Sequence, residues 1–145
     1  MDEHLRFKLS KEERICSKLQ IDRLFGGGNS HSMTAFPIRV VYLQENSKGH
    51  ETPVSILVSV PKRYFKRAVK RNRVKRQIRE AYRLNKHPII NKVESAEGQA
   101  LMIAFIWIDD KLHDSKEVER KVKSLLLRIE EKVLPIVQTP TDGNE

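Results

Sequence analysis

The pattern of hydrophobic and polar positions near the N-terminus predicts one helix from Ser10 to Phe25. Ser10 and Glu13 have the spacing of a capping box, in which each side chain accepts a hydrogen bond from the other residue's backbone N–H. Apolar residues follow at helical spacing, at positions 15, 19, 21, 24 and 25. The run GGGN at 26–29 should end the helix, because glycine adopts the left-handed cap conformation without penalty. It follows a helix and lacks the Lys-Ser/Thr of a phosphate loop, so we interpret it as a turn.

Four stretches predict strands, and one of them is short. The segment 36–44, FPIRVVYLQ, is typical of a strand, with a short strand near 32–35 before it. The segment 53–60 alternates a strongly apolar face with a mixed one, and the polar residues 45–52 predict a hairpin loop between the two strands. The segment 100–108, ALMIAFIWI, is almost continuously apolar, as expected for a strand in the middle of a sheet.

Two more helices are predicted after Pro61. In the first, Val74, Ile78, Ala81 and Tyr82 fall on one arc of a helix. Pro88 should end that pattern, and 91–99 should be a polar connector. The last helix starts at a capping pattern at positions 114 and 117 and has an apolar stripe at positions 118, 122, 125, 126, 129 and 133.

This order of elements predicts an α/β fold in which part of the sheet is parallel, because a strand–helix–strand crossover joins parallel strands. With 145 residues, 39% of them hydrophobic, the chain has room for one core. We expect a single domain over residues 1–134 and a flexible tail at 135–145.

Composition excludes several classes of protein. No apolar run approaches the 18 residues of a membrane span, and the N-terminus lacks the apolar core of a secretory signal. The single cysteine, Cys16, excludes an internal disulfide and is expected to be a small buried residue. We therefore expect a cytoplasmic protein.

The charge of the chain is concentrated in one segment. Between Lys62 and Lys86 there are twelve Lys or Arg residues and a single acid, Glu80. The rest of the chain has 16 basic and 18 acidic residues, so the net charge of +9 is a local segment of +11 on a nearly neutral body. On the helix, polar and basic residues fall on the arc roughly opposite the apolar stripe, at Asn72, Lys75, Arg76, Arg79, Arg83 and Lys86.

This segment predicts a polyanionic partner. An ordinary solvated helix face is the alternative, but such faces usually mix both signs of charge. A basic amphipathic helix could also bind a membrane or an acidic protein, but its apolar stripe is narrow and has no Trp or Phe. Nucleic acid fits better, because the guanidinium groups of seven arginines can each hold a phosphate with two hydrogen bonds.

Motifs for protein catalysis are missing from the sequence. The five histidines are scattered, without the i, i+4 pairing of a helical metal site, and no Cys pair, nucleophile elbow or Walker loop is present. Asp109 and Asp110 follow a strand and could hold a metal, but turn and capping roles are the favoured interpretation. A hydrolase that uses protein side chains alone is therefore not indicated.

Two adjoining stretches carry a family resemblance. The run LVSVPKR at 57–63, followed by AVKRNRVKRQIRE at 68–80, resembles the protein subunit of bacterial ribonuclease P. Its signature is the central Arg-Asn-Arg with Lys-Arg two residues later, and the resemblance covers roughly residues 5–134. It implies a two-layer α/β (α+β) sandwich in the order α-β-β-β-α-β-α, with a mixed four-stranded sheet, similar to a ribosomal-protein domain and with a left-handed crossover.

The resemblance also implies a function. In the family, a catalytic RNA subunit and its Mg²⁺ ions cleave the 5′ leader from precursor tRNA, and the protein is the accessory subunit of this endoribonuclease. The implied partners are the ribonuclease P RNA subunit and precursor tRNA, with no membrane and no DNA expected. The implied cofactor is Mg²⁺, bound mainly by RNA and substrate, and no protein side chain is catalytic. A ribosomal or other structured-RNA-binding protein without a catalytic assembly is the alternative.

By position, the resemblance assigns RNA contacts to Lys62, Arg63, Lys66, Arg67, Lys70, Arg71, Asn72, Arg73, Lys75, Arg76 and Arg79. The leader of the precursor would lie in a cleft between the first helix and the sheet, lined by Ile21, Phe25 and Phe36. Without the resemblance, ordinary core positions are the favoured interpretation of both phenylalanines.

The chain departs from the family at two points. Ile21 stands where many members have an aromatic residue and offers apolar contact in place of a ring. The residues PKRYF at 61–65 stand where the family often has Ser-Lys-Lys and a glycine-containing loop, so Tyr64 or Phe65 is a candidate stacking ring.

Overall fold

The computed structural model describes residues 9–15, 17–50 and 52–133 of the chain. The expectations for Cys16 and for the tail at 135–145 fall outside these ranges. Within them, each predicted strand is present. The elements are η1 (Lys11–Glu13), α2 (Lys18–Gly26), β1 (His31–Ala35), β2 (Ile38–Asn46), β3 (Val54–Ser59), α3 (Ala68–Asn85), α4 (His87–Ser95), β4 (Gln99–Trp107) and α5 (Ser115–Lys132).

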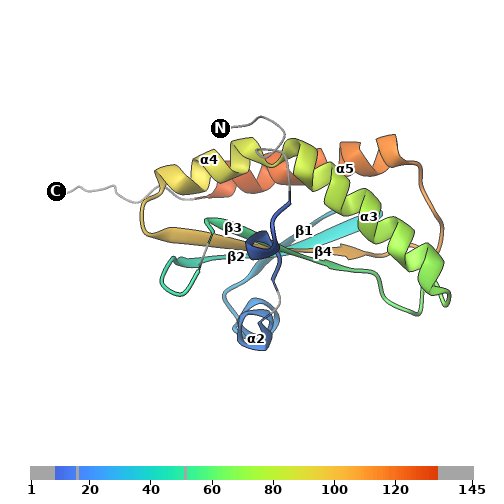
Figure 1. The fold of residues 1–145 in the computed structure, drawn as a ribbon, viewed down its shortest axis with the longest axis horizontal. Helices are drawn as coiled ribbons and strands as arrows, with labels where there is room; N and C mark the ends of the chain where they lie inside the picture. The colour runs from blue at the N-terminus through green and yellow to red at the C-terminus, as the bar shows by residue number, and fades with distance from the viewer. Residues whose placement is uncertain (1–8, 16, 51, 134–145) are drawn as a thin grey trace.

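The four strands form one mixed sheet in the order β1-β2-β4-β3 (Figure 1). β2 runs antiparallel to both of its neighbours, whereas β3 runs parallel to β4, which confirms the predicted crossover. The hairpin predicted at 45–52 is wrong, because β4 lies between β2 and β3 and takes the hydrogen bonds that a hairpin would form. A central position buries both faces of β4, and this suits its almost continuous apolar sequence.

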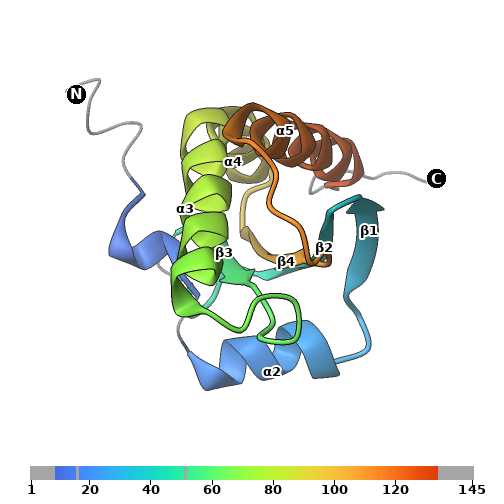
Figure 2. The ribbon, with the colours of Figure 1, turned by 90° about the vertical axis from the view of Figure 1, so that its right-hand side faces the viewer.

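Helices lie on both faces of the sheet. α3, α4 and α5 cover one face, and α2 crosses the other (Figures 1 and 2). Alternate residues of β4 contact the two sides: Ile103 and Phe105 pack under the three helices, and Met102 packs toward α2. On the α2 side Leu57 and Ile106 are only half-buried, so the cover there is incomplete.

The second and third predicted helices are confirmed. The stripe of Val74, Ile78, Ala81 and Tyr82 on α3 is buried against the sheet and α5. α5 is capped by Asp114, the residue before it, whose side chain accepts a hydrogen bond from the backbone N–H of Glu117 at 2.8 Å. Its predicted stripe is buried along its whole length. Burial of these stripes fixes which faces of α3 and α5 remain in solvent.

The single helix predicted at the N-terminus is wrong. The capping box of Ser10 and Glu13 is present, but it opens only the three-residue 3-10 helix η1. The backbone N–H of Ile15 then donates to the carbonyl oxygen of Ile56 on β3 at 2.7 Å, which interrupts the helical hydrogen bonds. α2 starts afresh after Ser17, whose hydroxyl caps it. The open edge of β3 and the burial of Ile15 outweigh local helix propensity here.

The polar connector predicted after Pro88 is also wrong, because this stretch forms α4. Pro88 lies in the first turn of α4, where its missing N–H would have no helical partner in any case. Ile89 and Val93 are buried in the main core, which stabilises the helix. Among the described residues, neither α4 nor any other helix has the length and apolar character needed to cross a membrane.

Candidate nucleic-acid interface

The loop that leads into α3 is held by an arginine of the helix itself. Arg67, at the N-cap position, makes no side-chain capping bond. Instead, Nη1 of Arg71 donates to the backbone carbonyl oxygens of Phe65 and Lys66, each at 2.8 Å. Arg71 is therefore half-buried, and part of its hydrogen-bonding capacity is used within the protein.

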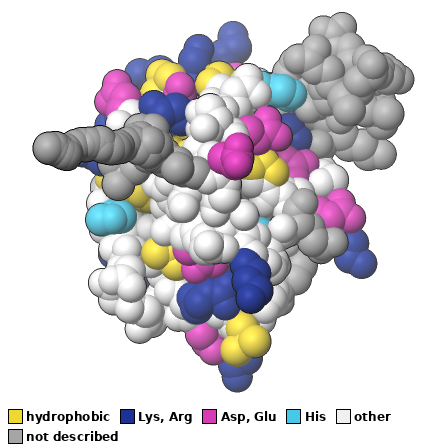
Figure 3. Space-filling view, turned by 90° about the vertical axis from the view of Figure 1, so that its left-hand side faces the viewer, with side chains coloured by type: hydrophobic (Ala, Val, Ile, Leu, Met, Phe, Trp, Pro, Cys, Tyr) yellow, Lys and Arg dark blue, Asp and Glu magenta, His cyan; other side chains and the backbone are white. Residues whose placement is uncertain are grey.

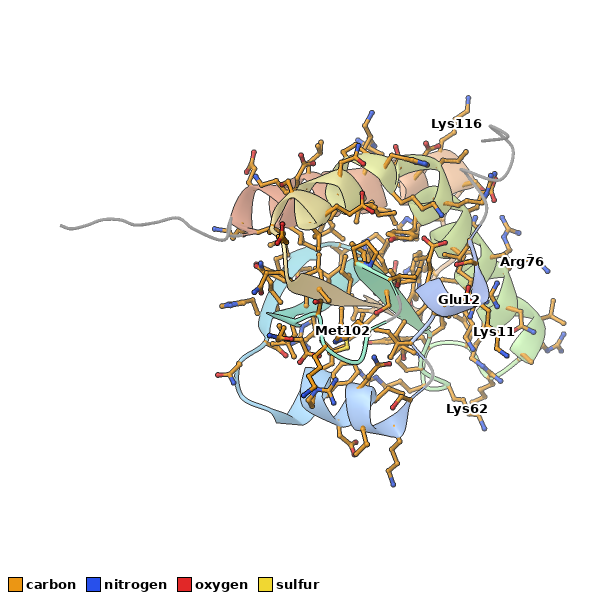
Figure 4. All side chains as sticks on the ribbon, turned by 60° about the vertical axis from the view of Figure 1, so that its left-hand side comes forward. Lys11, Glu12, Lys62, Arg76, Met102 and Lys116 are labelled. Carbon is orange, nitrogen blue, oxygen red and sulfur yellow. The ribbon has the colours of Figure 1, made fainter. Side chains whose placement is uncertain are left out.

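Most of the predicted RNA-contacting side chains extend into solvent, as Figure 4 shows for Lys62 and Arg76. Lys75 and Arg79 join Arg71 as the half-buried members. Within the described part of the chain, none of the ten cations in the predicted set lies within 4.0 Å of a carboxylate oxygen. The exposed members are Lys62, Arg63, Lys66, Arg67, Lys70, Asn72, Arg73 and Arg76.

Two cations near the end of α3 are neutralised by acids of the protein. Arg83 pairs with Glu80 at 2.6 Å, and this hydrogen bond raises the pKa of Arg83 and lowers that of Glu80. The expectation that Lys86 belongs to the exposed basic arc is wrong. Its Nζ donates to both carboxylate oxygens of Glu13 at 2.9 Å, and its side chain is 4% exposed. The chain turns from α3 into α4 at this residue, so Lys86 leaves the helix face and points inward.

The basic surface occupies one part of the molecule. The exposed cations lie on the first half of α3 and on the loop before it. At the end of the molecule away from this region, Figure 3 shows acidic and basic side chains interspersed. A field of one sign over a rigid helix attracts a polyanion, whereas a mixed surface does not.

A second candidate surface is a hollow of about 360 Å³ between α2 and the sheet. Phe25 contributes its ring to this hollow and is 48% exposed. Ile21, one turn earlier, is half-buried and packs on the small core beneath α2. The residues that line the hollow are Leu24, Phe25, Gly28, Ser30, His31, Ser32, Arg39, Val41 and Ile106.

The structure does not bring Phe36 to the hollow that Phe25 lines. Phe36 lies in the turn between β1 and β2, 56% exposed, and is not among the lining residues. Neither phenylalanine is buried, so the interpretation of both as ordinary core residues is wrong.

Of the two candidate rings before α3, only one is at the surface. Phe65 is buried in the main core. Tyr64 is half-buried, and the guanidinium carbon of Arg63 lies 4.9 Å from the centre of its ring. The Arg63–Tyr64 pair therefore presents a cation stacked on an aromatic face beside the basic helix.

Sequence reasoning missed two cations that face these surfaces. Arg39 is an exposed residue between two fully buried ones, and it reaches the hollow beside Phe25. It is the single charged residue in the apolar segment 36–44, and this could have identified it, because an isolated charge in a strand marks a position on the face that is open to solvent. Arg14 is exposed between the buried Glu13 and Ile15, and no local pattern identifies it because the helix predicted there is not formed.

Two histidines outside the basic surface are bound to carboxylates. His50 contacts Glu45, and Nε2 of His113 lies 2.8 Å from Oδ2 of Asp109. The hydrogen bond from His113 lowers the pKa of Asp109. Asp109 thus has a structural partner in the loop after β4. The described residues contain no group of three or more His, Cys, Asp or Glu side chains placed to hold a metal ion.

Sequence comparison relates the chain to known proteins over most of its length. Residues 9–130 match the family model for Ribonuclease P. A curated ribonuclease P protein component from Porphyromonas gingivalis is 46% identical over 123 residues, which cover 85% of this chain and 87% of that protein. Another, from Clostridium novyi, is 32% identical over 120 residues, which cover 83% of this chain and 96% of that protein.

Solved structures share the fold. The ribonuclease P protein of Staphylococcus aureus aligns with a TM-score of 0.61 at 24% identity, over 81% of this chain and 94% of that one. The protein from Thermotoga maritima aligns with a TM-score of 0.58 at 23% identity, over 80% of this chain and 96% of that one. With the family model and the curated relatives, this agreement means that the chain belongs to the family of ribonuclease P protein components.

Proposed function

We propose that this chain is the protein subunit of a cytoplasmic ribonuclease P ribonucleoprotein, and that it binds the catalytic RNA subunit and the 5′ leader of precursor tRNA to support endonucleolytic 5′ maturation of tRNA. The observation that carries this proposal is the row of exposed cations on α3 that have no acidic partner among the described residues. Such cations bind a polyanion with release of its counterions.

α3 is suited to a folded RNA because its position in the protein is fixed. Val74 and Ile78 are fully buried, so the helix does not rotate about its axis without exposing core residues. Arg73 and Arg76 then project at a fixed spacing, and each guanidinium can hold a phosphate with two hydrogen bonds. Arg71 contributes less to binding, because it also holds the loop before the helix.

The leader would occupy the hollow on the α2 side. The half-exposed ring of Phe25 offers a face on which an unpaired base can stack, and Arg39 offers a charge for a neighbouring phosphate. Ile21, one turn earlier on α2, is not among the residues that line the hollow and would add apolar contact only beside it. Phe36 would meet the leader only beyond the hollow, at the turn between β1 and β2.

The chemistry in this proposal belongs to the RNA. Mg²⁺ favours phosphate oxygens and retains several water molecules, so we assign the ions to the RNA subunit and the substrate. The protein would reduce the repulsion between RNA phosphates, which lowers the Mg²⁺ concentration needed for cleavage.

Reconstitution tests the proposal. The protein is added to ribonuclease P RNA at a Mg²⁺ concentration at which the RNA alone is inactive, and leader cleavage of a precursor tRNA is measured. We expect the protein to restore cleavage. If it binds the RNA but restores none, it is a structured-RNA-binding protein without a catalytic assembly. Cleavage by the protein without any RNA would overturn the assignment of chemistry to the RNA.

A further inference from the structure

A groove between the N-terminal segment and α3 is lined by arginines from two distant parts of the chain. It encloses about 810 Å³. α3 contributes Arg73, Arg76 and Arg79, and the residue after η1 contributes Arg14. Figures 2 and 4 show η1 beside α3, with Lys11 and Glu12 near the helix. Arg14 thus brings a cation from outside the basic segment to the same surface.

The backbone holds Arg14 firmly in this place. Its neighbour Ile15 is buried and donates to the carbonyl oxygen of Ile56, and Arg14 itself forms a bridge to Ile56. Its other neighbour, Glu13, is bound to Lys86 through both carboxylate oxygens. The backbone of Arg14 is therefore held in place relative to α3 before any ligand binds, and its side chain is exposed.

The charges of Arg14 and Arg79 act on each other across the groove. Partial burial lowers the pKa of Arg79, and the charge of Arg14 lowers it further. The acid that lines the groove, Glu80, is bonded to Arg83 instead. In the ranges that the structure describes, no carboxylate oxygen lies within 4.0 Å of Arg14 or Arg79. An anion between two such groups relieves their repulsion.

We propose that Arg14 and Arg79 together bind one phosphate group of the ribonuclease P RNA subunit, so that the RNA-contacting surface extends from α3 onto the N-terminal segment. This inference rests on the proposed function. A phosphodiester offers two non-bridging oxygens, and each guanidinium offers a fork of N–H donors, so one phosphate can be held from both sides of the groove.

The test measures binding of the RNA subunit to the full-length protein over a range of salt concentrations. The variants are Arg14→Gln, Arg79→Gln and the double variant, with Lys123→Gln as the control because Lys123 is an exposed cation on α5 that is not among the residues lining the groove. We expect each single variant to bind at least about tenfold more weakly at low salt, as for loss of a charge-assisted hydrogen bond. The slope of log affinity against log salt should fall by about one in the double variant, as for one phosphate.

The affinity of the double variant decides whether the two arginines bind the same phosphate. If both arginines hold the same phosphate, the double variant loses less affinity than the product of the two single losses. A loss equal to that product would mean two independent contacts and would overturn the shared site. Binding of Arg14→Gln that equals that of Lys123→Gln would also overturn it.

Urea unfolding separates a binding role from a structural one. Arg14→Gln and Arg79→Gln should unfold at the same urea concentration as the wild type or slightly above it, because each removes a repulsion. A lower midpoint in both would indicate a structural role and contradict the inference. If the wild type itself fails to bind the RNA, the proposed function fails. If it binds and restores cleavage while the arginine variants match the control, this inference alone fails.

Discussion

The buried ion pair between Glu13 and Lys86 allows a quantitative test of how the N-terminal segment is attached. The substitution Glu13→Gln removes the charge but keeps a side chain that can still serve the capping box with Ser10. It leaves the Lys86 ammonium group buried opposite a neutral amide. The effect on stability therefore reports the ion pair and not the cap.

The size of the effect follows from the burial of both groups. The side chains of Lys86 and Glu13 are only 4% and 10% exposed, so solvent screens them little. Removal of one partner from a buried ion pair lowers the free energy of unfolding by about 3–5 kcal/mol. A domain of this kind has a total unfolding free energy of about 5–15 kcal/mol, so the variant should lose a large part of its stability. The further substitution Lys86→Met should restore much of this loss, because no uncompensated charge then remains.

Urea unfolding followed by tryptophan fluorescence measures this loss of stability directly, because the single tryptophan, Trp107, is fully buried in the main core. With an m-value of about 2 kcal/mol/M, Glu13→Gln should lower the midpoint by about 1.5–2.5 M. A midpoint within about 0.5 M of the wild type would mean that the pair is exposed in solution. A double variant Glu13→Gln/Lys86→Met less stable than Glu13→Gln would refute the argument about the uncompensated charge.

Four further outcomes test the surfaces and the core. Arg76→Ala should weaken RNA binding and flatten its salt dependence while unfolding like the wild type, and a lowered melting temperature would contradict the exposed position of Arg76. Ile78→Asp should lower the free energy of unfolding, measured with urea, by more than about 4 kcal/mol, because the charge would be buried without a partner. A urea midpoint near that of the wild type would refute the orientation of α3. Phe25→Ala should weaken binding of a leader-containing precursor tRNA about tenfold but leave binding of a leaderless tRNA unchanged; equal losses would rule out stacking on the leader. The hydrogen bond from His113 holds the pKa of Asp109 below its ordinary value of 3.8, so the contribution of the Asp109 carboxylate to stability is present above that pH and is lost as the pH falls through the lowered pKa. In acid titrations the wild type should therefore lose more stability than Asp109→Asn, and parallel stability curves would contradict this.

Several features could be predicted from the sequence because their causes are local. The stripe of Val74, Ile78, Ala81 and Tyr82 identifies the buried face of α3 by helical periodicity alone. The concentration of cations between Lys62 and Lys86 is a property of composition and needs no fold to be seen. The cap at Asp114 lies within three residues of its partner, and the run at 100–108 is apolar enough to predict a central strand.

Other features depended on the tertiary structure because their partners are far apart along the chain. Lys86 resembles one more cation of the basic face until Glu13, 73 residues away, neutralises it inside the protein. The N-terminal helix is interrupted because the edge of β3 offers Ile15 a hydrogen bond and a buried site, and the loop at 45–52 is no hairpin because β4 enters between the strands that it joins. Arg14 reaches α3 only as a result of these contacts. Periodicity reports which face of an element is buried, but competition among distant segments for the same edge, charge or cavity is decided only when the whole chain is packed.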